Sequence, residues 1–259
     1  MKYILLPIYL LVLTVTNVAH SVTMQGFKYY SEEYPPYNYI EQQSIKGIAV
    51  DLLFETGKRT GSKITESQID LLPWPRAYHI VQTTPNTVLL TAARTASREA
   101  DFKWLGPIGK TRVVVLAKKQ SNIVINKPQD LTQHVIGIVR EDISEHLLRD
   151  TGIKGIKVEY ANTAFPLVKM LNSDRVDLWA YEEQVARSAI TSLGFNNEDF
   201  EVVYVLQELE LYYAFNLETD DKLIQHLQQS FNQLKRTSEG SDTSYYDRVL
   251  MKYGMLNLK

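Results

Sequence analysis

The stretch that decides the fold runs through Leu72-Pro73-Trp74-Pro75-Arg76, Thr87-Val88-Leu89-Leu90-Thr91-Ala92-Ala93, Arg94-Thr95-Ala96-Ser97-Arg98-Glu99 and Phe102-Lys103-Trp104-Leu105-Gly106-Pro107. This order predicts a loop, a short helix, a buried strand and then the start of a helix that carries two arginines. Unpaired backbone N–H groups at a helix start and fixed guanidinium charges both attract anions. The stretch therefore predicts an anion site with aromatic side chains beside it.

Composition narrows the class of protein. The chain has 259 residues, of which 44% are hydrophobic and 22% charged, which suits one large domain or two lobes. The net charge of −2 and the absence of a Lys/Arg run argue against nucleic-acid binding. The chain has no cysteine, which excludes disulfides, cysteine–zinc sites and a lipid-modified cysteine anchor. Its five histidines form no HExxH motif, so we expect no metal and no cofactor.

The first residues resemble an export signal. Lys2 precedes the apolar run Ile4 to Val15, and Ala19-His20-Ser21 has a small-x-small cleavage pattern. We predict that residues 1–21 are a signal peptide cut before Val22, and an uncleaved anchor helix is the alternative. The expected location is the periplasm, with a soluble mature chain and no lipid anchor.

Strands and helices alternate twice along the chain, once before about Gly109 and once after about Asn122. This alternation predicts two α/β lobes with largely parallel sheets. We assign residues 22–109 and 207–259 to lobe 1 and residues 110–206 to lobe 2, with hinge crossings near 107–116 and 203–212. The last two predicted helices, Asp220–Lys235 and Ser244–Tyr253, have no strands of their own, so we expect them to pack on lobe 1.

Several motifs together resemble one family. They are Tyr34-Pro35-Pro36-Tyr37, Gly47-x-x-x-Asp51-Leu52, Trp74, Thr95-x-x-Arg98-Glu99, Val135-Ile136-Gly137-Ile138-Val139, Arg175-Val176-Asp177 and Tyr246-x6-Tyr253. In this order they resemble the extracellular solute-binding proteins of family 3, the polar amino-acid-binding proteins of ABC importers. The resemblance covers residues 24–257. It implies an α/β, two-lobed type II periplasmic-binding-protein fold, whose two mixed or parallel sheets are joined by two hinge strands.

The resemblance also implies roles for four side chains. Arg98 would hold the α-carboxylate of a ligand, Tyr34 and Trp74 would enclose its side chain, and Glu182 would bind its amino group. A guanidinium presents a planar fork that matches a carboxylate, which agrees with the first role. The alternatives are a surface ion pair for Arg98, core packing for Trp74, and a helix first-turn role for Glu182.

The chain departs from the family pattern at the site itself. Ser31 and Ala93 stand where the family often has Asp and Ser/Thr, and Glu141-Asp142 replace a Gly-Thr/Ser turn that donates hydrogen bonds to the carboxylate. Arg94 and Arg140 are extra cations near the expected cleft, and we include both among the candidate ligand-binding residues. The identity of the ligand stays open.

Three functions are compatible with these residues. The first is a non-enzymatic periplasmic binding protein that closes, like a Venus flytrap, on a small polar ligand and delivers it to an ABC permease. The second is a lyase on the same scaffold, similar to cyclohexadienyl dehydratase, with Glu182 as general acid. The third is a ligand-sensing module without transport. For the first we expect a monomer whose partners are the ligand and the permease.

Overall fold

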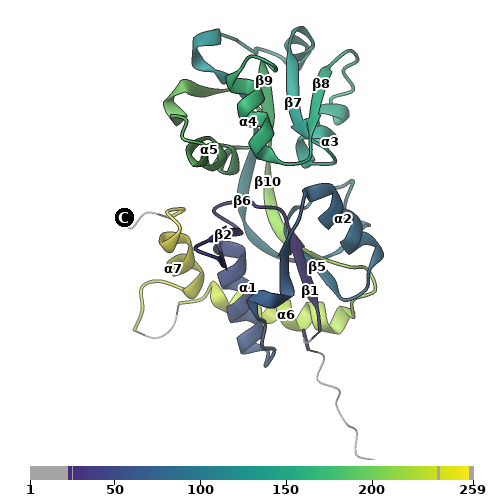
Figure 1. Ribbon diagram of the computed structural model, residues 1–259. Helices are drawn as coiled ribbons and strands as arrows, with labels where there is room; N and C mark the ends of the chain where they lie inside the picture. Colours follow the sequence, from purple (N-terminus) through teal and green to yellow (C-terminus); the bar gives the residue numbers. More distant parts are fainter. Residues whose placement is uncertain (1–22, 25, 238–239, 257–259) are drawn as a thin grey trace, which may run out of the picture.

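The structure, a computed structural model, describes residues 23–24, 26–237 and 240–256. Two lobes stand one above the other, joined by two long strands (Figure 1). The predicted signal peptide, residues 1–21, lies outside the described residues. Within the described ranges, no helix has the length and apolar character needed to span a bilayer.

The first lobe is built on three parallel strands in the order β4-β1-β5. These are β1 (Lys28–Ser31), β4 (Ile69–Leu71) and β5 (Thr87–Ala93), with helices α1 (Ile48–Arg59) and α2 (Trp74–Thr83), the hairpin strands β2 (Tyr39–Glu41) and β3 (Ser44–Lys46), and the 3-10 turn η1 (Glu66–Gln68). Every residue of β5 is buried. A parallel strand that is covered on both faces has apolar side chains on both, which explains the continuous apolar run Thr87–Ala93 in the sequence.

Two strands of 16 residues each form the hinge. They are β6 (Lys103–Lys118) and β10 (Phe200–Phe215), which pair antiparallel with Leu211 opposite Gly109. The connections expected at 107–116 and 203–212 fall within these strands. Since β10 also pairs with β5, and β6 pairs with β9, both lobes share one eight-stranded sheet, ordered β4-β1-β5-β10-β6-β9-β7-β8.

The second lobe repeats the parallel pattern with β7 (Val135–Val139), β8 (Lys157–Ala161) and β9 (Leu178–Glu182). Its helices are α3 (Ile143–Asp150), α4 (Ala164–Asn172) and α5 (Glu183–Ser192), and its 3-10 turns are η2 (Lys119–Ser121), η3 (Pro128–Gln133) and η4 (Asn197–Asp199). The carboxyl ends of β7 and β9 point toward the first lobe. A three-residue turn, 140–142, joins β7 to α3, and α5 follows β9 directly, so the residues at these junctions face the space between the lobes.

The C-terminal helices α6 (Asp221–Leu234) and α7 (Tyr245–Lys252) pack on the first lobe, where both contact α1. The ammonium of Lys252 pairs with the carboxylate of Asp51 at 2.7 Å, and the Gly47 N–H donates to the Tyr253 hydroxyl at 3.0 Å. Gly47 has a φ of 132°, and a Cβ there would lie 2.1 Å from the carbonyl oxygen of Tyr37. Only glycine allows α1 to start so close to the aromatic loop, residues 32–38 between β1 and β2.

Two predictions of local structure are wrong. The predicted helix at Arg94–Glu99 is a series of turns, in which the Arg98 N–H donates to the Thr95 carbonyl at 3.1 Å. The hydroxyls of Thr95 and Ser97 bond to each other at 3.1 Å rather than capping a helix. The sequence also predicts a strand over Lys63–Leu71, but the observed strand is limited to β4, because η1 (Glu66–Gln68) occupies the residues before it.

Candidate functional site

Arg98 lies between the lobes and is 1% exposed. Its guanidinium carbon is 5.4 Å from the centre of the Trp74 ring and 5.2 Å from that of Tyr78, a cation–π arrangement on both. Burial lowers the pKa of Arg98, although nearby Tyr78 and Asp142 oppose this effect. Among the described residues its Nε–H has no hydrogen-bond partner, and no carboxylate lies within ion-pairing distance of its guanidinium. A buried cation with a free donor is suited to an acceptor supplied by a ligand.

The carbonyl oxygen of Glu141, in the second lobe, accepts hydrogen bonds from two side chains of the first lobe. It accepts a hydrogen bond from Arg98 Nη2 at 3.1 Å and another from Trp74 Nε1 at 2.9 Å. Glu141 has a φ of 59°, a left-handed conformation in the turn between β7 and α3. The turn therefore presents an acceptor to the first lobe, and Asp142 beyond it uses its own carboxylate to cap α3 through the Ser144 N–H at 3.0 Å.

The aromatic loop after β1 places Tyr34 against the second lobe. Asn38 anchors the loop through Nδ2, which donates to the Ser31 hydroxyl at 2.9 Å and to the Glu32 carbonyl at 2.8 Å. The ring of Tyr34 meets that of Tyr181, at the end of β9, edge to face with centroids 6.1 Å apart. Ser31, one of the departures from the family pattern, thus serves to hold this loop.

Glu32 adds a carboxyl group to the same space and is 4% exposed. Burial raises its pKa well above the ordinary value, and the charge of Asp142 raises it further. Asp142 is likewise 4% exposed. The pKa of the Tyr181 hydroxyl is raised by burial and then by the charges of Glu32 and Asp142, so the three groups lie close together across the gap.

Glu182 lies at the end of β9 and is 1% exposed. One carboxyl oxygen accepts a hydrogen bond from Thr111 on β6, and the other caps α5 through the Val185 N–H at 2.7 Å. Burial raises its pKa to about 7, although these hydrogen bonds act in the opposite direction. Its charge also raises the pKa of Tyr34, which places it beside the aromatic loop.

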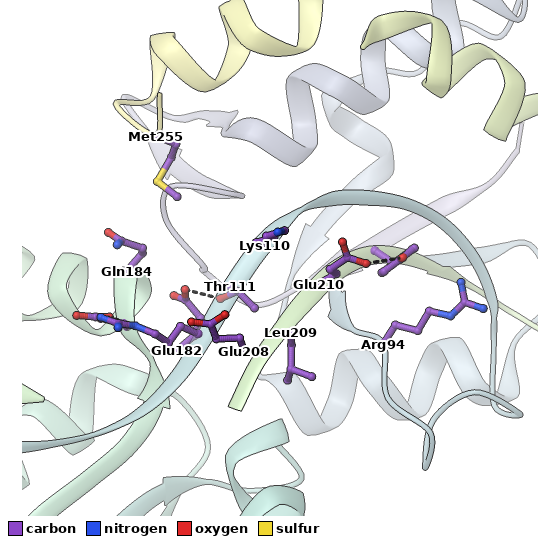
Figure 2. Close-up of a pocket in the computed structure, with 12 residues that line it drawn as sticks. Arg94, Lys110, Thr111, Glu182, Gln184, Glu208, Leu209, Glu210 and Met255 are labelled. Atoms are coloured by element: carbon purple, nitrogen blue, oxygen red, sulfur yellow. Dashed lines mark hydrogen bonds and ion pairs between the residues drawn. The ribbon is translucent and has the colours of Figure 1, made fainter. Parts of the chain in front are cut away.

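Arg94 lies apart from this cluster, in a hollow of about 770 Å³ over the hinge strands (Figure 2). Its guanidinium forms two hydrogen bonds with the carboxylate of Glu99, at 2.8 and 2.6 Å, and lies 5.2 Å from the ring centre of Tyr212. In Figure 2, Glu182 and its partner Thr111 line the opposite end of the hollow. The structure thus brings Tyr34, Trp74, Arg98 and Glu182 to the gap between the lobes and leaves Arg94 at the hinge.

Arg140 is also placed away from the cluster. Its guanidinium carbon lies 4.5 Å from the ring centre of Tyr160, on the neighbouring strand β8, and its side chain is exposed. A guanidinium that stacks on an exposed ring at the edge strand does not extend toward Arg98.

Sequence reasoning missed Glu32 and Tyr181, and it identified Glu141 only as a departure from the family pattern, without the role of its carbonyl oxygen. Glu32 was one residue of an irregular loop, Tyr181 one of several aromatic residues in an apolar strand, and the carbonyl of Glu141 has no signature in the sequence. One signal was available. Glu182 was predicted to bind the ligand, and Tyr181 directly precedes it in the sequence. The prediction for Glu182 therefore already placed the end of β9, and Tyr181 with it, at the gap between the lobes.

Comparisons with known proteins agree with this architecture. Residues 29–244 match the bacterial extracellular solute-binding proteins, family 3. The P235GK mutant of ArgBP from T. maritima has a TM-score of 0.74 and 19% identity, covering 88% of this chain and 95% of that one. The substrate-binding protein of an amino acid ABC transporter has a TM-score of 0.70 and 20% identity, covering 88% and 99%. A histidine kinase sensor domain similar to periplasmic binding proteins has a TM-score of 0.75 and 16% identity, covering 88% and 96%.

Identities of this size show the fold alone, which is the two-lobed fold of periplasmic binding proteins. No curated protein sequence matches the chain.

Proposed function

Because the chain belongs to family 3 of the bacterial extracellular solute-binding proteins, we propose that it captures a small polar ligand between its lobes in the periplasm and delivers it to an ABC permease. The ligand is an amino acid or a related anion or zwitterion. The lobes close around the ligand, and the permease recognises this closed conformation. Residues 1–21 act as the signal peptide for export.

The observation that carries this proposal is the burial of the Arg98 guanidinium without an ion-pair partner among the described residues. A guanidinium that is 1% exposed and lacks an ion pair among the described residues is costly, because its hydration is lost without a compensating charge. A ligand carboxylate that accepts from the free Nε–H removes that cost and can bind the planar fork through two oxygens. Trp74 and Tyr34 then bound the ligand on either side, and Glu182 takes its amino group.

A thermal-shift screen of the mature protein tests the proposal. The panel holds the common amino acids, their decarboxylated amines and small dicarboxylic acids. A compound present at 100 times its Kd adds about 2.7 kcal/mol to the free energy of unfolding, which gives a readily measured shift in Tm. If no member of the panel shifts Tm, the small-molecule function is wrong.

Two other functions remain as alternatives. The buried carboxyl of Glu182, with a pKa of about 7, is in the protonation range of a general acid, which favours testing the lyase on this scaffold by assaying prephenate turnover. The fold is also similar to a histidine kinase sensor domain, so a sensing role is tested by deleting the cognate permease and measuring whether a ligand-dependent response survives.

A further inference from the structure

Two adjacent glutamates at the junction of β9 and α5 differ in how their charges are balanced. Glu183 accepts hydrogen bonds from two guanidinium groups, that of Arg112 on β6 at 2.7 Å and that of Arg187 on α5 at 2.9 Å. Glu182 is 1% exposed and belongs to no ion pair in the described part of the chain. The chain therefore neutralises Glu183 and leaves Glu182 for a cation that comes from outside.

Hydrogen bonds take the place of an ion pair at Glu182. Its Oε1 accepts one from the hydroxyl of Thr111, and its Oε2 accepts one from the Val185 N–H at 2.7 Å (Figure 2). A carboxylate can accept about four hydrogen bonds, so both oxygens retain acceptor capacity. An ammonium group can therefore bind Glu182 without displacing either donor.

The charge of Glu182 depends on the groups that face it. These are Thr111 on β6, Glu183, Gln184 and Val185 on α5, and Tyr34 and Tyr37 in the aromatic loop. Burial raises the pKa of Glu182 to about 7, and the Thr111 hydroxyl opposes this effect more than the backbone N–H groups of α5 do. Thr111 is therefore the side chain that favours the charged form of Glu182 most strongly.

The strand β6 is fixed on both sides of Thr111. On the side of the first lobe, the Tyr37 hydroxyl donates to the Lys110 carbonyl at 3.4 Å. On the side of the second lobe, Val113 pairs with Glu182 in the sheet. Thr111 itself is 7% exposed. Its hydroxyl is therefore held against Glu182 before a ligand arrives.

We infer that Thr111 is a positioning residue that keeps the Glu182 carboxylate oriented and charged for the amino group of the ligand. This inference rests on the proposed function, in which Glu182 takes that amino group. Without the hydroxyl of Thr111, burial acts on Glu182 with less opposition. The carboxyl then holds its proton to a higher pH and binds an ammonium group poorly at neutral pH.

Carbon-13 NMR of the glutamate carboxyl groups tests the inference without a ligand. The signal that is missing in Glu182→Gln identifies Glu182, and its titration midpoint in the wild type is expected at about pH 7. Thr111→Val has nearly the same shape but no donor, and it should raise the midpoint by about one pH unit. Thr111→Ser restores the hydroxyl and should return the midpoint toward the wild-type value.

Thr87→Val is the matched control for this titration. Thr87 is also a buried threonine on a strand, but its hydroxyl donates to the Thr84 carbonyl within the first lobe. The control variant should leave the midpoint of Glu182 unchanged.

Calorimetry at two pH values connects this charge to binding, with L-alanine, L-glutamate and L-lysine as probes. At pH 7 about half of Glu182 is ionised in the wild type and about a tenth in Thr111→Val, so the variant should bind a probe about fivefold more weakly. At pH 9 Glu182 is largely ionised in both proteins, and the two Kd values should agree within about twofold. A merely structural loss would weaken binding equally at both pH values.

An unchanged midpoint in Thr111→Val overturns the role of Thr111, and so does a Kd ratio that is the same at both pH values. A raised midpoint confirms that Thr111 holds Glu182 in its charged form, whether or not a probe binds. Absence of binding to the probes and to every compound of the thermal-shift panel then overturns the proposed function alone.

Discussion

The indole Nε1 of Trp74 donates a hydrogen bond of 2.9 Å to the carbonyl oxygen of Glu141, and this bond joins the two lobes. Arg98 donates to the same oxygen at 3.1 Å. In the family that this chain resembles, the turn after this strand donates hydrogen bonds to the ligand. Here the left-handed conformation of Glu141, with φ at 59°, turns an acceptor toward the first lobe instead. Two lobe-1 donors therefore hold the lobes together through a backbone group of the chain itself.

Replacing Trp74 with phenylalanine should shift the lobes toward an open arrangement. The variant keeps an aromatic ring against Arg98 but removes the N–H, and the loss of one such hydrogen bond costs about 0.5–1.5 kcal/mol. Small-angle scattering of the ligand-free protein should show a larger radius of gyration. Trp104→Phe is the matched control, because Trp104 Nε1 bonds to Glu99 within the same lobe at 3.4 Å. An equal response of the two variants would contradict the role of the Glu141 contact.

Glu141→Gly should stabilise the folded protein. A non-glycine residue in the left-handed region costs about 1 kcal/mol relative to glycine. The gain is partly offset because the glycine chain is more flexible when unfolded, so we expect an increase of a few tenths to about 1 kcal/mol in the free energy of unfolding by urea titration. Glu141→Val, which is strongly disfavoured at this φ, should lose stability. If valine is tolerated as well as glycine, the turn does not hold this conformation in solution.

The stability of the protein should depend on Glu182 in a pH-specific way. Burial raises the pKa of this carboxyl from 4.5 to about 7, so the folded state binds its proton more tightly than the unfolded state. The associated stabilisation is present below pH 4.5 and is lost as the pH rises to about 7, by up to about 3 kcal/mol. Glu182→Gln cannot ionise, so its stability relative to the wild type should be greater at pH 8 than at pH 5. Denaturation curves that differ by the same amount at both pH values would contradict the raised pKa.

The sequence predicted the fold well because its signals are local. An apolar run such as Thr87–Ala93 predicts a strand, and a helix start such as Ser244 predicts a helix, wherever the segment lies in the fold. The hinge could be predicted because the lobes are connected without a flexible linker. Prediction failed at Arg94–Glu99, where a helix start was predicted but the hydroxyls of Thr95 and Ser97 bond to each other and cap no helix.

The site was only partly predictable because it depends on relations between distant segments. Arg94 and Arg98 are four residues apart, but without a helix they do not share a face, and Arg94 turns to Glu99. The position of Arg140 follows from the register of β7 with β8, which puts Tyr160 beside it. Glu32 and Asp142 come together only when the lobes meet, and no spacing in the sequence encodes that distance.

The most direct test of the whole account is calorimetry on wild type and Arg98→Met with the panel compound that gives the largest thermal shift. Methionine keeps an apolar stem between Trp74 and Tyr78 but has no charge and no donor. Loss of a buried, charged hydrogen-bond partner costs about 2–5 kcal/mol, so the variant should bind at least about 30-fold more weakly. Arg76→Met, which removes an exposed arginine from α2, should bind as the wild type does. Equal affinity of Arg98→Met and wild type would contradict the central claim that Arg98 anchors a ligand between the lobes.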